Sequence, residues 1–147
     1  MSMKERLAEE TKDALKSGQK VRLSTLRLLS AAVKNREVEV RHPLDDEEFV
    51  EVAGQEAKRR RDAIEAYEKA GREDRAATER EELGVLQEYL PAALTDEEID
   101  ALVDQAIGET GATGPGDMGK VMGAVMAKAK GRADGHAVQA RVRGRLA

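Results

Sequence analysis

The chain has 147 residues, with 25 Lys and Arg against 29 Asp and Glu, and a net charge of −4. It contains no cysteine, which excludes disulfide frameworks, thiolate nucleophiles and cysteine metal sites, and its only histidines are His42 and His136. No apolar run approaches the roughly 18 residues of a membrane helix, and residues 1–10 lack the apolar stretch of a signal peptide. We therefore expect a cytoplasmic protein with no membrane segment.

Apolar residues recur every three to four positions along nearly the whole chain, and no alternating run indicates a β-strand. This pattern predicts an all-α protein. Ser2 and Glu5 form a capping box at the start of a first helix, which ends at Gly18. Its inner face is predicted to hold Met3, Leu7, Thr11, Ala14 and Leu15. A second helix, over about residues 19–40, is predicted to turn inward Val21, Leu26, Leu28, Leu29, Ala32 and Val33.

A third helix is predicted to follow Asp45, whose side chain can cap its first turn. Gly71 stands where a left-handed residue would end this helix. Glu56 and Arg60 are one turn apart on its inner stripe, so we expect them to form an ion pair.

The boundary between two helical subdomains is predicted near Pro91. A fourth helix over about residues 73–90 leads into this proline, which cannot continue it. We therefore expect an N-terminal helical bundle over residues 1–92 and a C-terminal three-helix subdomain over residues 93–147.

The predicted C-terminal subdomain has clear helix starts and stops. A capping box at Thr95 opens a short helix, and the four glycines and one proline of residues 108–116 predict a loop. Asp117 then opens a helix that stops at Gly131, and Asp134 caps the last helix.

Methionines and tyrosines are interpreted as packing residues. Met118, Met122 and Met126 recur every four positions, a stripe that fits core packing better than an adaptable peptide groove. Tyr67 and Tyr89 are interpreted as half-buried anchors whose hydroxyls reach solvent.

Charge is strongly segregated along the chain. Residues 1–41 carry ten basic and six acidic groups, residues 42–116 carry eight and 21, and residues 117–147 carry seven and two. The segments therefore have net charges of +4, −13 and +5. An acidic chain of this kind can still present a local cationic face.

The basic residues of the last segment are the candidate binding site for a phosphate-bearing partner. Within the segment they are opposed only by Asp117 and Asp134, both at expected helix starts. Arg132 lies in a tight turn that can bring backbone amides and a guanidinium close to a phosphate. No aromatic platform accompanies them, so we expect sequence-independent contact with a folded RNA backbone, or else only a soluble basic surface. The candidates are Lys120, Lys128, Lys130, Arg132, Arg141, Arg143 and Arg145.

Other chemistry finds little support in the sequence. Residues 114–120 match the G-x-x-x-x-G-K part of a phosphate-binding loop, but Val121 replaces the magnesium-binding hydroxyl and no strand is predicted before the loop. The abundant carboxylates mostly have basic neighbours at helical spacing, and no pair is singled out for general acid and base catalysis. We predict no catalytic residue, no metal and no cofactor.

Several motifs together resemble a known family. They are the stretch 117–123, Asp-Met-Gly-Lys-Val-Met-Gly; the stretch 130–135, Lys-Gly-Arg-Ala-Asp-Gly; residues 26–35; the stretch 67–72, Tyr-Glu-Lys-Ala-Gly-Arg; and Tyr-Leu-Pro at 89–91. In combination they resemble YqeY-like proteins, which are related to the tail of the GatB subunit of glutamine-dependent aspartyl/glutamyl-tRNA amidotransferase. The resemblance covers nearly the whole chain.

The resemblance implies two all-helical subdomains and a role near tRNA. In the amidotransferase the corresponding tail contacts the tRNA elbow, and the family label is carbon–nitrogen ligase activity with glutamine as the amide donor. The parts that activate the tRNA and release ammonia lie outside the region resembled, so we expect a chain that is noncatalytic on its own. The leading hypothesis is a tRNA-binding or amidotransferase-associated accessory protein. The alternative is a protein–protein interaction module that does not bind RNA.

Overall fold

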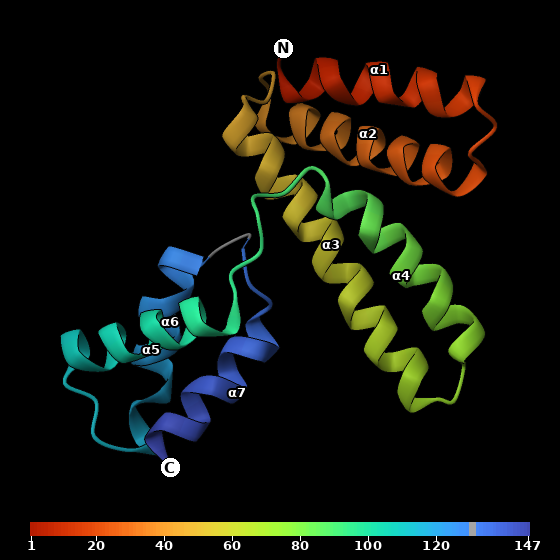
Figure 1. Cartoon of the computed structure of the whole chain (residues 1–147). Helices are drawn as coiled ribbons and strands as arrows, with labels where there is room; N and C mark the ends of the chain where they lie inside the picture. Colours follow the sequence, from red (N-terminus) through yellow and green to blue (C-terminus); the bar gives the residue numbers. More distant parts are fainter. Residues whose placement is uncertain (130–131) are drawn as a thin grey trace. The chain divides into compact units, whose positions relative to one another are not determined.

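The computed structural model describes residues 1–129 and 132–147, and this part of the chain forms seven α-helices, one 3₁₀ turn and no strand (Figure 1). The all-α prediction is confirmed. The chain divides into two compact units, Met1–Leu90 and Pro91–Ala147. Each unit has a hydrophobic core of its own, as expected of a structural domain.

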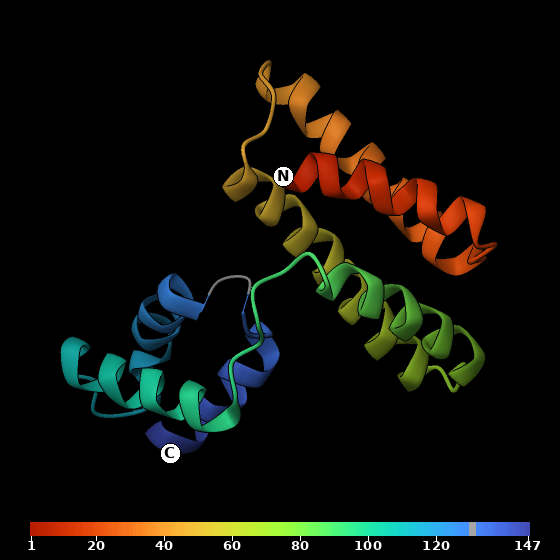
Figure 2. The same ribbon diagram turned by 45° about the horizontal axis from the view of Figure 1, so that its top comes forward.

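The first unit contains two antiparallel helical hairpins. One is formed by α1 (Met3–Lys16) and α2 (Lys20–Val40), the other by α3 (Asp46–Lys69) and α4 (Glu73–Gln87) (Figures 1 and 2). Helix α2 contacts both α3 and α4, which joins the two hairpins. The largest side chains in the shared core are Leu26, Leu29, Phe49, Leu86 and Tyr89.

Side-chain caps start the helices where the sequence predicts them. The Ser2 hydroxyl accepts a hydrogen bond from the Glu5 N–H at 3.1 Å. The Glu48 N–H donates to the Asp45 carboxylate at 2.8 Å, and the Asp45 N–H donates to Glu48 at 3.2 Å, which completes a capping box. Gly71 has a φ of +71°, the left-handed conformation expected after α3.

Two leucines predicted to face inward are instead exposed. Leu28 on α2 is 47% exposed, while the adjacent Leu29 is fully buried, and Leu15 on α1 is also exposed. Successive residues on a helix are rotated by about 100°, so with Leu26, Leu29 and Val33 facing the core, the Leu28 side chain points away from it. The inward prediction for Leu28 and Leu15 is therefore wrong.

A largely buried arginine side chain links α3 to α4. Arg60 lies in α3 and pairs with Glu56 at 2.7 Å, which confirms the predicted ion pair. Its Nε also lies 3.4 Å from Glu82 of α4. The Arg60 side chain is only 12% exposed, so these carboxylates compensate a charge that is largely removed from water.

The second unit packs three helices against one another. They are α5 (Asp96–Thr110), α6 (Met118–Ala129) and α7 (Gly135–Leu146), and a 3₁₀ turn (Pro115–Asp117) precedes α6. Its core is built mainly from Val103, Val121, Val125, Val138 and Val142. The three methionines of α6 lie partly buried against this core, as interpreted from their spacing.

Helix α5 is longer than predicted. The expected loop over residues 108–116 is wrong at its start, because α5 continues through Gly108 to Thr110. A glycine inside a helix costs only about 1 kcal/mol relative to alanine, and the packing of this helix outweighs that cost. Gly111 takes the left-handed conformation, with φ of +68°, and ends the helix.

The pair Leu28 and Leu29 tests the orientation of α2. We expect Leu29→Ala to lower the free energy of unfolding by about 2–5 kcal/mol, because it leaves a cavity in the core. Leu28→Ala should change it by no more than about 0.5 kcal/mol, because the side chain is largely exposed. Urea unfolding of both variants measures the difference, and equal losses would show that α2 is rotated from the orientation described.

Candidate functional site

Most of the candidate phosphate-binding residues lie on α6 and α7, and several are paired with acids of α5. Asp96 and Asp100 lie one turn apart on α5, and Arg141 of α7 binds them at 2.9 and 2.8 Å. Arg145, one turn further along α7, lies 3.5 Å from Asp104. A row of aspartates on α5 therefore faces a row of arginines on α7. Lys128 of α6 similarly lies 3.5 Å from Glu109.

These pairs show that acids outside residues 117–147 also oppose the basic groups of that segment. Counting within residues 117–147 left only Asp117 and Asp134 to oppose the basic groups, because the acids of α5 belong to the preceding segment of the sequence. The folded unit, residues 91–147, holds seven basic and eight acidic residues, a net charge of −1. The spacing of Asp96, Asp100 and Asp104 at every fourth position was a readable signal for an acidic helix face.

The predicted phosphate-binding turn makes internal contacts. The Arg132 Nε donates to the Ala92 carbonyl at 3.1 Å, and the Leu94 N–H donates to the Arg132 carbonyl at 2.7 Å. Arg132 thereby fastens the segment before α5 to the turn before α7. The candidate Lys130 lies outside the described residues.

Lys120 and Arg143 are the least constrained of the described candidates. The Lys120 side chain is 71% exposed, and its contact with Asp117 is long, at 4.0 Å. Arg143 is exposed, and the described part of the chain offers it no carboxylate within ion-pair distance. Both residues can therefore reach an external anion with little loss of internal bonding.

The glycine-rich stretch 114–120 lies between two helices. Helix α5 precedes it, whereas a phosphate-binding loop follows a strand. The Asp117 carboxylate accepts a hydrogen bond from the Thr113 N–H at 3.0 Å, and this bond lowers the pKa of Asp117 below its ordinary value. An ionised carboxylate at this position would repel a phosphate.

The described residues form neither a membrane-spanning helix nor a cluster of metal ligands. None of the helices there is sufficiently long and apolar to cross a membrane. That part of the chain also has no group of three or more His, Asp or Glu side chains arranged to hold a metal ion.

A polar cluster in the first unit joins elements distant in the sequence. Tyr89 is buried and its hydroxyl donates to Glu10 at 2.7 Å. Arg22 bridges Glu10 at 2.8 Å and Glu88 at 2.7 Å, and Arg6 lies over the Tyr89 ring at 4.3 Å. The prediction that the Tyr89 hydroxyl reaches solvent is therefore wrong. Its partner is 79 residues away, so local periodicity could not reveal the contact.

The electrostatics of this cluster indicate a structural role. Burial raises the pKa of the Tyr89 hydroxyl far above its ordinary value, so the group stays protonated and donates. Burial also raises the pKa of Glu10, but hydrogen bonds from Arg6 and Tyr89 outweigh this effect and leave it below its ordinary value. Glu10 is thus an ionised acceptor that ties α1 to α2 and to the segment after α4.

Comparison with known sequences places the chain in a family. The sequence model of Yqey-like proteins matches residues 4–146, and the chain belongs to this family. Two curated relatives carry the name altered inheritance of mitochondria protein 41, mitochondrial. The chain is 34% identical to that of Pyrenophora tritici-repentis over 130 residues, which is 87% of this chain and 71% of the relative. It is 30% identical to that of Eremothecium gossypii over 110 residues, which is 73% of this chain and 60% of the relative.

The comparisons confirm the resemblance drawn from the sequence motifs and correct the expected location. The family match covers the N-terminal motifs as well as the C-terminal ones. Both relatives are named as mitochondrial proteins, which contradicts the cytoplasmic location expected from the sequence. Composition and the first ten residues were insufficient grounds for that expectation.

The Glu10 cluster predicts a specific pH dependence of stability. Because the pKa of Glu10 is lower in the folded chain, its contribution is present above the unfolded-state pKa and is lost as the pH falls through the folded-state pKa. Glu10→Gln should cost about 1.5–3 kcal/mol at pH 7, since it removes charged hydrogen bonds.

Urea unfolding at several pH values between neutral and acid conditions measures this contribution. The stability difference between Glu10→Gln and the natural chain should shrink as the pH falls. A difference that stays constant or grows toward acid pH would contradict the structural role assigned to the ionised Glu10.

Proposed function

We propose that this chain is a noncatalytic accessory protein that binds tRNA in support of a glutamine-dependent tRNA amidotransferase. That enzyme class forms a carbon–nitrogen bond with glutamine as the amide donor. Membership of the YqeY-like family over residues 4–146 supports the assignment, together with the resemblance of the C-terminal motifs to the GatB tail. Amidotransferase subunits are the protein partners that this role implies.

The observation that carries the proposal is the set of accessible cations on α6 and α7. Lys120 and Arg143 are the freest, and the side chains of Lys128 and Arg145 are each 45% exposed despite their ion pairs. Exposed ion pairs contribute only about 0–1 kcal/mol, so phosphate oxygens can replace the carboxylates at little cost. Phosphate contacts of this kind position a protein on RNA without reading bases.

Binding is a better assignment than catalysis for this site. The aspartates of α5 are held by α7 arginines, and Asp117 accepts a backbone hydrogen bond. The hydrogen bond from the Thr113 N–H lowers the pKa of Asp117, so this carboxylate is a poor general acid at neutral pH. The tRNA-activating and ammonia-releasing steps would then belong to partner subunits.

A second candidate function is a protein–protein interaction module that does not bind RNA. The observation that favours it is the same pairing of Arg141 between Asp96 and Asp100, in a unit whose net charge is −1. Long-range attraction of a polyanion by such a unit is weak. The two candidates are separated by measuring tRNA affinity directly.

A double variant tests the tRNA proposal. Lys120→Ala with Arg143→Ala should weaken tRNA binding about tenfold and lower the slope of log affinity against log salt by about 2, because two phosphate contacts are lost. Lys58→Ala with Arg75→Ala removes two exposed cations from the first unit and should leave affinity nearly unchanged. Fluorescence titration of labelled tRNA at several salt concentrations supplies both numbers. Equal losses in the two double variants would show that only overall charge matters.

Removing a carboxylate that pairs with the α7 arginines should raise tRNA affinity, which tests the proposal in the opposite direction. Asp100→Asn removes the carboxylate shared by Arg141 and Arg145, so tRNA affinity should rise about three- to tenfold, as expected when a competing anion is lost. Glu81→Gln makes the same charge change at an exposed position of α4 and is the matched control. If the natural chain and Asp100→Asn both fail to bind tRNA, the interaction-module candidate takes its place.

A further inference from the structure

One face of α2 is exposed along the length of the helix and belongs to no part of the site described above. We call it the α2 face. It consists of Lys20, Ser24, Arg27, Ala31, Lys34 and Val38, all of them exposed. The opposite face carries Leu26, Leu29 and Val33 into the core, so α2 cannot rotate to bury the exposed residues.

The α2 face repeats every seven residues. Lys20, Arg27 and Lys34 form one row, and the small or apolar residues Ser24, Ala31 and Val38 form a second. This alternation of four- and three-residue steps is the spacing by which one helix packs along another. Small side chains in the second row would let the axis of a partner helix approach to about 8–9 Å.

The face is cationic and partly apolar. In the described part of the chain, Lys20, Arg27 and Lys34 have no carboxylate within ion-pair distance. Leu28 lies beside the cationic row and is 47% exposed, and Val38 is 72% exposed. The face therefore combines three unpaired cations with two exposed apolar side chains.

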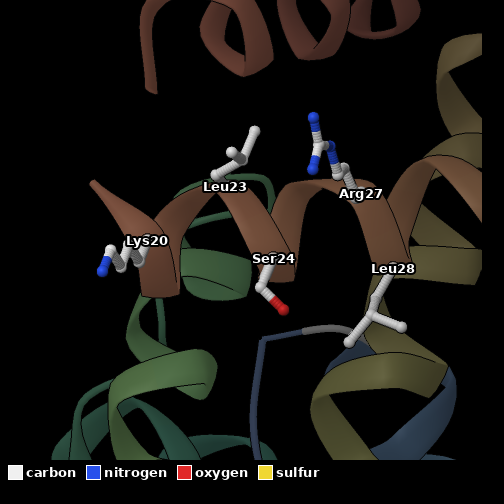
Figure 3. Close-up of a pocket in the computed structure, with 5 residues that line it drawn as sticks. All are labelled: Lys20, Leu23, Ser24, Arg27 and Leu28. Atoms are coloured by element: carbon white, nitrogen blue, oxygen red, sulfur yellow. The ribbon is translucent and has the colours of Figure 1, made fainter. Parts of the chain in front are cut away.

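A shallow depression marks the N-terminal half of the face. It has a volume of about 340 Å³, and Lys20, Leu23, Ser24, Arg27 and Leu28 line it. Leu23 and Arg27 project along one edge, and Ser24 and Leu28 along the other (Figure 3). An apolar side chain of a partner could lie on Ser24 between Leu23 and Leu28, with a carboxylate reaching Arg27.

We propose that the α2 face docks a helix of a partner protein that carries a carboxylate at every seventh position beside apolar side chains. Charge complementarity selects the acidic partner, because three cations on one helix face have no acid to balance them there. Burying Leu28 and Val38 against apolar side chains of a protein removes their surface from water, whereas a phosphate backbone offers no apolar surface to bury them.

The spacing also sets the length of the partner helix. Lys20 and Val38 are 18 residues apart, so the face is about 27 Å long at 1.5 Å per residue. A partner helix of about 20 residues would match it. Carboxylates spaced seven residues apart meet the three cations in either helix direction. The proposal does not rest on tRNA binding, since the α2 face and the candidate tRNA site lie on different units.

Two synthetic peptides test the proposal with the full chain. The first is a 21-residue helical peptide with Glu at every seventh position and Leu and Ala on the adjacent positions. The second has the same composition, with its three Glu residues spaced five positions apart. Fluorescence anisotropy should show the first peptide binding at least tenfold more tightly, and equal affinities would overturn the proposal.

Matched variants locate the binding surface. Arg27→Glu with Lys34→Glu should abolish the preference for the first peptide, and Leu28→Ala should weaken binding several-fold. Lys58→Glu with Arg75→Glu makes the same charge change on α3 and α4 and should leave the affinity unchanged. All these positions are exposed, and unfolding curves verify that the variants fold. If the control variant loses affinity equally, the contact is a general charge effect and the proposal is wrong.

Competition and self-association measurements separate the proposed occupant from others. Added tRNA should not displace the first peptide from the Lys120→Ala, Arg143→Ala variant, and displacement would identify the α2 face as an RNA surface. Sedimentation should show that the natural chain does not self-associate through the α2 face, so Arg27→Glu with Lys34→Glu should leave its sedimentation unchanged. If the natural chain self-associates and this double variant does not, the occupant of the α2 face is a second copy of the chain, contrary to the proposal.

Discussion

The pairing of α7 arginines with α5 aspartates determines how the C-terminal unit can act. Arg141 lies between Asp96 and Asp100, and Arg145 lies between Asp100 and Asp104. These contacts place three α5 carboxylates beside two α7 arginines and so offset much of the positive charge at the end of the sequence. Because the pairs are partly exposed to water, they are weak enough for a phosphate to exchange with a carboxylate.

Sequence patterns over a few neighbouring residues predicted much of the fold but few of the contacts made by the candidate site. Helix caps such as Asp45 and the Glu56–Arg60 pair depend on residues a few positions apart, so the sequence predicted them. The contact between Tyr89 and Glu10, and the acids facing Arg141, depend on how distant helices pack. Helical periodicity gives only the approximate direction of the inner face, and it misplaced Leu28 for that reason.

The structure separates two kinds of surface. The C-terminal unit presents cations in partial balance with its own acids, an arrangement that suits reversible contact with a polyanion. The α2 face of the first unit presents unbalanced cations next to exposed Leu28 and Val38, which suits a protein partner. An accessory protein with both surfaces could hold a tRNA and a protein at the same time, one on each unit.

Chemical shifts of the backbone amides during a tRNA titration show whether residues 91–147 hold the RNA. We expect changes on α6 and α7 around Lys120 and Arg143, and on α5 around Asp100 as the arginines exchange carboxylates for phosphates. Signals of α2 should not move. If tRNA leaves the amides of residues 91–147 unaffected, or if the changes are confined to α2, the C-terminal unit is not the tRNA-binding surface.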